Sequence, residues 1–198
     1  MSESTAPHRH PAVDTARPDF WEGMSPCEHF VHLYEGERAL LDLLQGFIAD
    51  GLRGGDATVV IATPDHLAAL DRRLNANGFD LVAARWQGQY LPMDAKATLG
   101  QFMVGGQPDE EQFERVMAEV LARARRNGRN VRAFGEMVAL LWAAGNASAT
   151  VRLEQLWDAF CKRESLPLFC AYPKAAFKGD ASESLAAICK AHSRLIAA

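Results

Sequence analysis

The chain has 198 residues, a length that suits one α/β domain with a tail. Hydrophobic residues make up 48% of it and charged residues 23%, which is ordinary for a globular protein. A net charge of -4 argues against a general binder of nucleic acids or anionic membranes, so we expect neither as a partner.

The cysteines and the apolar runs narrow the class of protein further. The four cysteines are widely spaced and form no C-x-x-C pair, so they predict neither a zinc site nor a disulfide framework. No apolar run approaches the roughly 20 residues needed to cross a bilayer, and the N-terminal stretch lacks the apolar core of a signal peptide. These features predict a cytoplasmic protein with reduced thiols, without a metal and without a cofactor.

The N-terminal segment differs in composition from the rest of the chain. Residues 1–24 are rich in Ser, Thr, Pro, Ala and Arg and show no hydrophobic periodicity. Such a segment cannot bury enough apolar surface to offset the entropy lost on ordering. We therefore predict a flexible leader over residues 1–24 and a single domain over residues 25–198.

Strand and helix patterns alternate from His29 onward. The β-rich run HFVHLY precedes ERALLDLLQGFIADGLRGG, whose apolar positions share one helical stripe. Because His29 and His32 are an odd number of positions apart on the expected strand, they point to opposite faces and cannot share a metal ion. The continuous apolar run DATVVIAT is typical of a parallel strand covered on both faces, and a helix follows from Pro64 to Gly78.

The middle of the chain has weaker patterns. Residues 79–93 predict one or two short strands interrupted by Gly88. Helical patterns resume at Asp94, first in AKATLGQFMVGG and then in PDEEQFERVMAEVLARARRNG. The second of these has acidic residues in its first turn and arginines in its last turn, which matches the helix dipole.

The C-terminal half repeats the alternation. NVRAFGE predicts a strand, MVALLWAAG a short helix, and Asn146 an N-cap for the helix ASATVRLEQLWDAFCKRE. LPLFCAYP predicts a last buried strand before a helix around Leu185 to Ile196. The whole pattern indicates a three-layer α/β fold, with a mainly parallel sheet and helices on both faces.

In sheets of this kind, ligands bind in the crevice at the carboxyl ends of the strands. The expected strand ends bring polar and aromatic side chains to that edge, with a tryptophan nearby on a following helix. This mixture of apolar and polar groups is typical of small-molecule sites. The candidate ligand-binding residues are Tyr34, Glu35, Thr63, His66, Glu136, Met137, Trp142 and Tyr172.

Each candidate also has a purely structural interpretation. Glu136 would favour the N-terminus of the helix that follows it, an interpretation as strong as a functional one for that residue alone. Tyr34 and Tyr172 are the kind of core aromatics whose hydroxyls reach water, Trp142 suits helix packing, and His66 suits an exposed first turn. The convergence of these residues at one edge favours the ligand-binding interpretation.

Motifs for nucleotide binding and catalysis are missing. The first strand-to-helix turn, LYEGERALL, has no lysine and one glycine, so it lacks the phosphate-binding pattern G-x-x-x-x-G-K-[ST]. The chain also lacks G-x-G-x-x-G, G-x-S-x-G and H-E-x-x-H. We therefore predict no catalytic residue, no enzymatic activity and no ATP site.

Several blocks together resemble one known family. HFVHLYEGERALLDLLQGFIADGLRGGDATVVIATPDHLAAL, DAKATLGQFMVGGQPDEEQF, VRAFGEMVALLWAAGN, LEQLWDAF and LFCAYP are similar to the MEDS domain, a sensory domain named for methanogens, methylotrophs and the regulator DcmR. The resemblance spans roughly His29 to Phe177. It implies a signalling input module, found alone or attached to histidine kinases and transcription regulators, that senses small hydrocarbon derivatives. The layout also resembles RecA and KaiC-like ATPases, which implies such a fold without its P-loop.

Two functions remain open. The first is a non-catalytic sensory module that binds a small organic ligand, with hydrocarbon derivatives as one class, and relays its occupancy to a regulator or histidine kinase. The alternative is a protein–protein interaction module without a small ligand, docking to the same kinds of partner. An enclosed cavity would support sensing, whereas a flat exposed patch would support docking. Assembly into a homo-oligomer also stays open.

Overall fold

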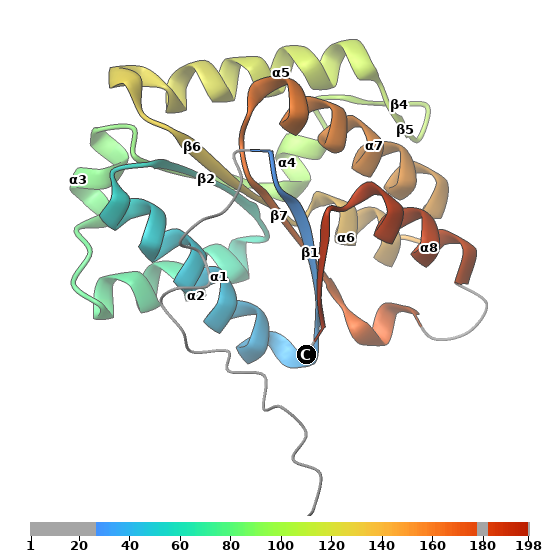
Figure 1. Ribbon diagram of the computed structural model, residues 1–198, viewed down its shortest axis with the longest axis horizontal. Helices are drawn as coiled ribbons and strands as arrows, with labels where there is room; N and C mark the ends of the chain where they lie inside the picture. Colours follow the sequence, from blue (N-terminus) through green and yellow to red (C-terminus); the bar gives the residue numbers. More distant parts are fainter. Residues whose placement is uncertain (1–26, 178–181, 198) are drawn as a thin grey trace, which may run out of the picture.

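A six-stranded sheet forms the centre of the molecule (Figure 1). The computed structural model describes residues 27–177 and 182–197, so the predicted leader lies outside the described residues. The strand order is β3-β2-β6-β7-β1-β8, and every neighbouring pair is parallel, which confirms the predicted sheet. The strands are β1 (His29–Tyr34), β2 (Ala57–Ala62), β3 (Tyr90–Asp94), β6 (Val131–Gly135), β7 (Leu168–Pro173) and β8 (Arg194–Ala197).

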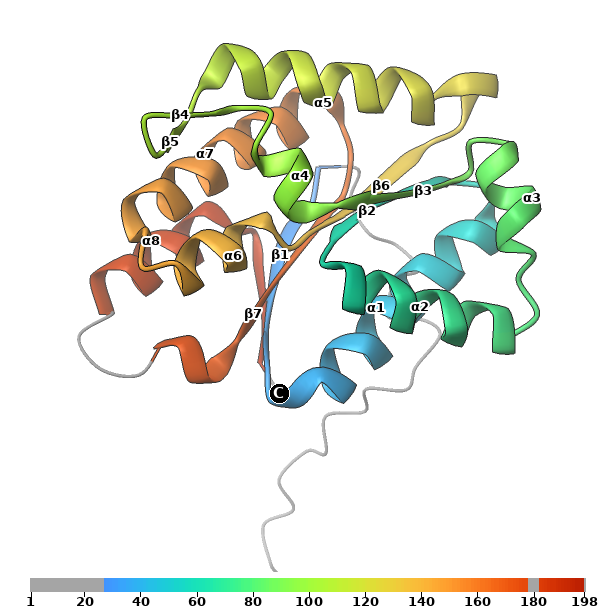
Figure 2. The same cartoon turned by 180° about the vertical axis from the view of Figure 1, so that it is seen from behind.

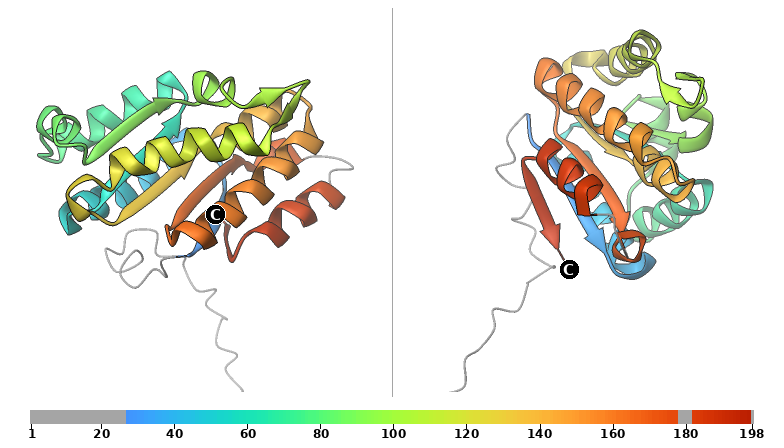
Figure 3. Two further views of the ribbon diagram at one scale, coloured as in Figure 1. Left: turned by 90° about the horizontal axis from the view of Figure 1, so that it is seen from above. Right: turned by 90° about the vertical axis from the view of Figure 1, so that its right-hand side faces the viewer.

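Helices cover both faces of the sheet (Figure 3). They enclose two separate apolar cores. One face packs against α1 (Gly36–Gly54), α2 (Pro64–Ala76) and α3 (Leu81–Trp86). The opposite face packs against the remaining helices, and the predicted three layers are therefore present. These helices are α4 (Ala95–Leu99), α5 (Glu110–Ala124), α6 (Met137–Ala143), α7 (Ala147–Glu164) and α8 (Ser182–Ala191).

The clearest sequence patterns gave correct elements. All six residues of β2 are buried, as expected for a strand with helices on both sides. The predicted stripe of α1 is fully buried, and Asn146 caps α7 by accepting a hydrogen bond from the backbone amide of Ala149 at 3.1 Å. In the described ranges, we find no helix with both the length and the apolar composition that a membrane span needs.

The region after α2 differs from the prediction of one or two strands. Residues 81–86 form helix α3, because the Asp80 side chain accepts a hydrogen bond from the Ala83 amide at 2.9 Å and caps the helix. Leu81 and Ala84 are buried on one side of α3. A single strand, β3, then follows Gly88, which has a left-handed φ of 67°. The sequence pattern of residues 81–86 is too short to show helical periodicity, so a strand was predicted where α3 forms.

Two other expected helices are shorter than predicted. The helix from Asp94 ends at Leu99 and is followed by a hairpin of β4 (Met103–Val104) and β5 (Gln107–Pro108), visible from behind in Figure 2. The C-terminal helix ends at Ala191, and residues 194–197 form β8 instead. This strand pairs with β1 at the edge of the sheet, a partner that lies far away in the sequence.

Candidate functional site

Glu136 joins the ends of two neighbouring strands. It follows β6, and its backbone amide donates a hydrogen bond to the carbonyl of Ile61 at 2.9 Å. The residue is buried, and Oε2 of its carboxylate accepts a hydrogen bond from the Thr63 amide at 2.8 Å. The side chain makes no capping hydrogen bond to α6, so helix capping does not explain its position. Glu136 is instead a buried acceptor at the carboxyl edge of the sheet.

The second oxygen of Glu136 holds His66. The imidazole Nδ1 of His66, in the first turn of α2, lies 2.7 Å from Oε1. Because the carboxylate can only accept, Nδ1 donates. This hydrogen bond raises the pKa of His66 and outweighs the burial that would lower it, and the charges of nearby carboxylates add to the rise. We call Thr63, His66 and Glu136 the crevice group.

Tyr34 lies at the margin of the crevice group. Burial, together with the charges of Glu136 and Glu37, raises the pKa of its hydroxyl to about 12. Tyr34 is therefore a neutral hydrogen-bonding group at physiological pH. Tyr34 is the last residue of β1, and its side chain is half-buried at the carboxyl edge of the sheet.

An open, groove-like cavity of about 530 Å³ lies beside the crevice group, and Thr63 is the member of that group that lines it. It lies between the ends of β2 and β3 and the helices α4 and α6, and its volume falls in the range of small-molecule sites. Asp94 also caps α4, since its side chain accepts a hydrogen bond from the Ala97 amide at 2.6 Å. The lining residues are Thr63, Pro64, Asp94, Lys96, Ala97 and Leu140.

Tyr172 does not join the crevice group, contrary to the predicted convergence. Tyr172 is opposite Leu33 in the register of β7 with β1, and Tyr34 is one position further along its strand. Side chains alternate between the faces of a sheet, so the two tyrosines point to opposite faces. The Tyr172 hydroxyl donates instead to Oε1 of Glu154 on α7, at 2.5 Å.

Three other predicted residues also lie outside the crevice group. Trp142 donates from Nε1 to the carbonyl of Ala176 at 2.9 Å, and its ring packs 4.8 Å from that of Phe177. Glu35 accepts a hydrogen bond from Lys174 at 2.7 Å. Met137 is fully buried in the core. Each of the three makes contacts within the fold, and their predicted role in ligand binding stays a prediction.

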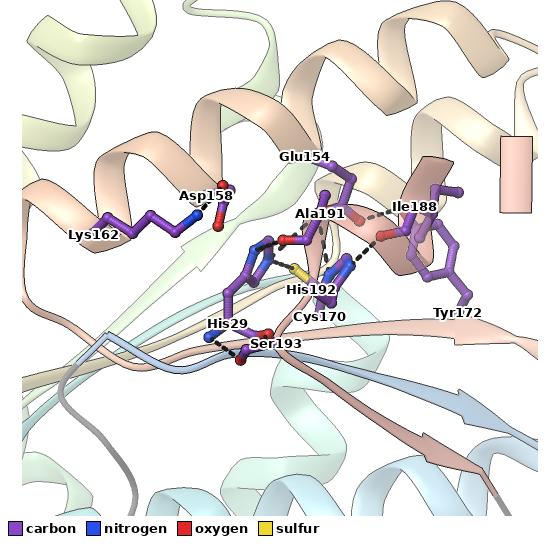
Figure 4. A network of polar contacts seen from close by, with 10 residues as sticks. All are labelled: His29, Glu154, Asp158, Lys162, Cys170, Tyr172, Ile188, Ala191, His192 and Ser193. Atoms are coloured by element: carbon purple, nitrogen blue, oxygen red, sulfur yellow. Dashed lines mark hydrogen bonds and ion pairs between the residues drawn. The ribbon is translucent and has the colours of Figure 1, made fainter. Parts of the chain in front are cut away.

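A second polar group, which the sequence analysis missed, lies in the core between the sheet and helices α7 and α8 (Figure 4). It contains His29, Glu154, Cys170 and His192, here called the buried cluster. One possible ligand atom from each residue lies within 4.8 Å of all the others, and in residues 27–177 and 182–197 this is the group that could hold a metal ion. His29 and Cys170 are 141 positions apart, so no motif of local spacing could reveal it.

The hydrogen bonds around the buried cluster orient both imidazoles. Nδ1 of His29 lies 3.1 Å from the carbonyl of Ala191, and Nδ1 of His192 lies 2.7 Å from that of Ile188. Burial lowers the pKa of His192, although the charge of Glu154 acts in the opposite direction. Burial also raises the pKa of the Cys170 thiol, and the charge of Glu154 adds to that rise. Both effects favour a neutral imidazole and a protonated thiol before any cation binds.

His32 takes no part in the buried cluster, which agrees with the odd spacing on β1. Its Nδ1 lies 3.1 Å from the carbonyl of Ile196 on β8, and its ring lies 6.2 Å from that of Tyr34. His29, by contrast, stacks at 4.0 Å on His192. The expectation of no metal rested on this spacing and on the cysteines, and it did not consider residues from other elements.

Comparison with protein families identifies a sensory-domain family. The model described as MEthanogen/methylotroph, DcmR Sensory domain matches residues 28–193. No curated protein sequence matches the chain significantly. The matched range begins just before β1 and ends just after His192, so it includes both the crevice group and the buried cluster.

Proposed function

The chain belongs to the MEDS family of sensory domains, and from this premise we propose that it senses a small organic ligand without chemical turnover. The ligand binds in the cavity beside the crevice group, and a partner regulator or histidine kinase reads its occupancy. The observation that supports this proposal is the open cavity of about 530 Å³ lined by Thr63, whose amide is bonded to the buried carboxylate that orients the His66 imidazole.

The lining of the cavity suits a small organic molecule. Pro64, Ala97 and Leu140 offer apolar contacts, while Thr63 and Lys96 offer a hydroxyl and a cation. Such a combination lets apolar surface supply affinity and a few polar groups supply orientation. A ligand with a short hydrocarbon part and one polar end fits this lining.

The position of the cavity suggests how occupancy is relayed. Its walls come from separate helices, because Pro64 begins α2, Ala97 lies in α4 and Leu140 lies in α6. A ligand that contacts all three helices stabilises one arrangement of them over others. A partner that binds the outer surface of α2 or α4 would then have a different affinity for the two states.

A second surface favours the alternative function of protein docking. Trp86 is 93% exposed at the end of α3, and it borders a groove of about 950 Å³ beside the edge strand β3. Exposed aromatic and arginine side chains are common at protein interfaces. The arginines that line this groove are Arg85, Arg123, Arg126 and Arg129.

Filling the cavity separates the two functions. We expect Ala97→Trp to fill it and abolish binding of short-chain alcohols, amines and carboxylates, measured by ligand-observed NMR on the full chain. Ala118→Trp, on the exposed face of α5, is the matched control and should keep binding. Untargeted mass spectrometry of compounds released from the purified protein supplies further probes.

Two results would contradict the sensing proposal. One is the absence of any small molecule that binds the wild-type chain and is lost in Ala97→Trp. The other is a partner regulator or kinase whose binding is lost in Trp86→Ala and is unaffected by every such compound. The second result would favour docking without a ligand.

A further inference from the structure

We propose that His29, Glu154, Cys170 and His192 bind one divalent transition-metal ion, with zinc as the ion that suits the donor set. The site is distinct from the cavity, because it lies in the core against α7 and α8. It therefore does not depend on ligand binding in the crevice. It replaces the expectation from sequence that the chain binds no metal.

The distances within the buried cluster match those between the ligands of a tetrahedral ion. Zinc lies about 2.0–2.3 Å from nitrogen, oxygen and sulfur ligands, so two ligand atoms of one tetrahedron lie about 3.3–3.7 Å apart. Nε2 of His29 lies 3.4 Å from Sγ of Cys170 and 3.5 Å from Oε2 of Glu154. Nε2 of His192 lies 3.4 Å from the same Oε2. Three edges of a tetrahedron are thus already in place.

The outer hydrogen bonds direct the free electron pairs inward. A main-chain carbonyl can only accept a hydrogen bond, so Nδ1 of His29 and Nδ1 of His192 both donate. In the neutral ring, Nε2 then has a lone pair, and in both histidines this atom faces the cluster. Histidines that bind metals usually donate from their other nitrogen in this way. Tyr172 supports Glu154 similarly by donating to Oε1, which leaves Oε2 for the ion.

Two atoms of the cluster point to a missing positive charge. Among the described residues, Oε2 of Glu154 and Nε2 of His192 are buried and have no hydrogen-bond partner. The side chains are 0% and 1% exposed, respectively, so bulk water does not satisfy them. Leaving such groups without a partner is costly inside a protein. One cation between them satisfies both.

The charges balance when the ion binds. Binding displaces the proton of the Cys170 thiol to solvent, and the resulting thiolate and the Glu154 carboxylate together neutralise a divalent ion. The donor set of two imidazoles, one thiolate and one carboxylate suits zinc better than magnesium or calcium, which prefer oxygen ligands. Because the protein supplies four ligands, no position remains open for a substrate, and the site is structural.

The ion would hold together parts of the chain that are far apart in sequence. His29 begins β1, Cys170 lies in β7, Glu154 lies in α7, and His192 follows α8. Metal binding would therefore fix α8 and the segment leading to β8 against the sheet. Removal of the ion should loosen this C-terminal region more than the opposite face.

The experiment measures metal in the purified full-length chain. We expect elemental analysis to find about one zinc per chain, and X-ray absorption at the zinc edge to show one sulfur ligand and three lighter ones. Exchange for cobalt should give tetrahedral d–d bands and a thiolate-to-cobalt charge-transfer band. Removal of the metal with a chelator should lower the melting temperature.

A matched pair of cysteine variants tests the assignment. Cys170→Ser should lose the charge-transfer band and most of the bound metal, whereas Cys189→Ser, on α8 and outside the cluster, should keep both. If Cys170→Ser fails to fold, the absorption spectrum of the wild-type chain still decides. Absence of stoichiometric zinc together with no cobalt binding under reducing conditions would overturn the proposal, as would a bound ion without a sulfur ligand.

Discussion

The crevice group and the buried cluster use the same residue types in opposite ways. In the crevice, Nδ1 of His66 donates directly to Glu136 at 2.7 Å. In the cluster, both histidines donate from Nδ1 to main-chain carbonyls and face Glu154 with Nε2, at 3.4 and 3.5 Å. In the crevice, the imidazole and the carboxylate share a proton. In the cluster, the Nε2 lone pairs and the carboxylate face one another, and a cation can bind between them. The group that accepts the Nδ1 proton therefore decides whether a histidine–carboxylate pair forms a hydrogen bond or can bind a metal ion.

Burial separates the two regions further. The side chains of His66 and Glu136 are 12% and 7% exposed, and Glu136 bonds to Thr63, which lines an open cavity. Those of His29 and Glu154 are 1% and 0% exposed. A group in contact with solvent can exchange protons and ligands, whereas a fully buried group acts through permanent contacts. We therefore expect mutations in the cluster to affect stability most, and mutations in the crevice to affect titration and binding.

The largest effect should come from Glu154→Ala. This change leaves the buried Tyr172 hydroxyl without its acceptor, which costs about 1–3 kcal/mol of unfolding free energy, and it opens a cavity in a fully buried site, which adds to the loss. Equilibrium unfolding in urea measures the loss. Glu119→Ala, on the exposed surface of α5, is the control and should change stability by less than about 0.5 kcal/mol. Equal losses of unfolding free energy in the two variants would show that the buried cluster does not contribute more to stability than an exposed residue.

A smaller loss is expected from Tyr172→Phe. The hydroxyl donates to a fully buried carboxylate, and a hydrogen bond to a charged group contributes about 1.5–3 kcal/mol. Tyr90→Phe is the matched control, because its hydroxyl donates to Asp71, whose side chain is 25% exposed and remains in contact with water. Urea unfolding should show the greater loss in Tyr172→Phe. A greater loss in Tyr90→Phe would show that burial of the acceptor does not decide how much such a hydrogen bond contributes to stability.

Glu136→Gln should have a modest, pH-dependent effect of about 1 kcal/mol, because Gln keeps the shape and loses the charge. The pKa of His66 is raised in the folded protein. The stabilisation from its pairing is therefore fully present below pH 6.5 and is lost as the pH rises through the folded pKa. Unfolding should show a larger difference from wild type at about pH 6 than at about pH 9.

NMR titration of His66 checks the same variant directly. The wild-type ring should titrate above its ordinary value of 6.5, and in Glu136→Gln it should titrate lower than in the wild type. His32 should show no comparable dependence on Glu136, because burial and the hydrogen bond to Ile196 govern its pKa. An unchanged titration of His66 in the variant would show that the hydrogen bond is not maintained in solution.

The smallest effect should come from Glu35→Gln. Its carboxylate is exposed and pairs with Lys174, and exposed ion pairs contribute little because water and salt screen them. We expect no measurable change in melting temperature at moderate ionic strength. A clear fall would mean that this pair closes a contact between β1 and the segment after β7 that the exposure of the two side chains does not suggest.

Local periodicity was enough to predict most elements of the fold. β2 is a continuous apolar run and α1 has a buried stripe, so both follow from the sequence alone. The strand-end rule also pointed to Thr63, His66 and Glu136, which the structure brings together. The rule works because parallel strands all end at one edge of the sheet. Their role in ligand binding stays a proposal.

Tertiary structure alone decided the remaining features. Strand β8 depends on pairing with β1, and the face to which Tyr172 points depends on the register of β7 against β1. The buried cluster requires two strands, α7 and the residue after α8 to meet in one place. Local sequence patterns record which face of an element is apolar, whereas contacts between distant elements depend on how whole layers pack, and no single segment contains that information.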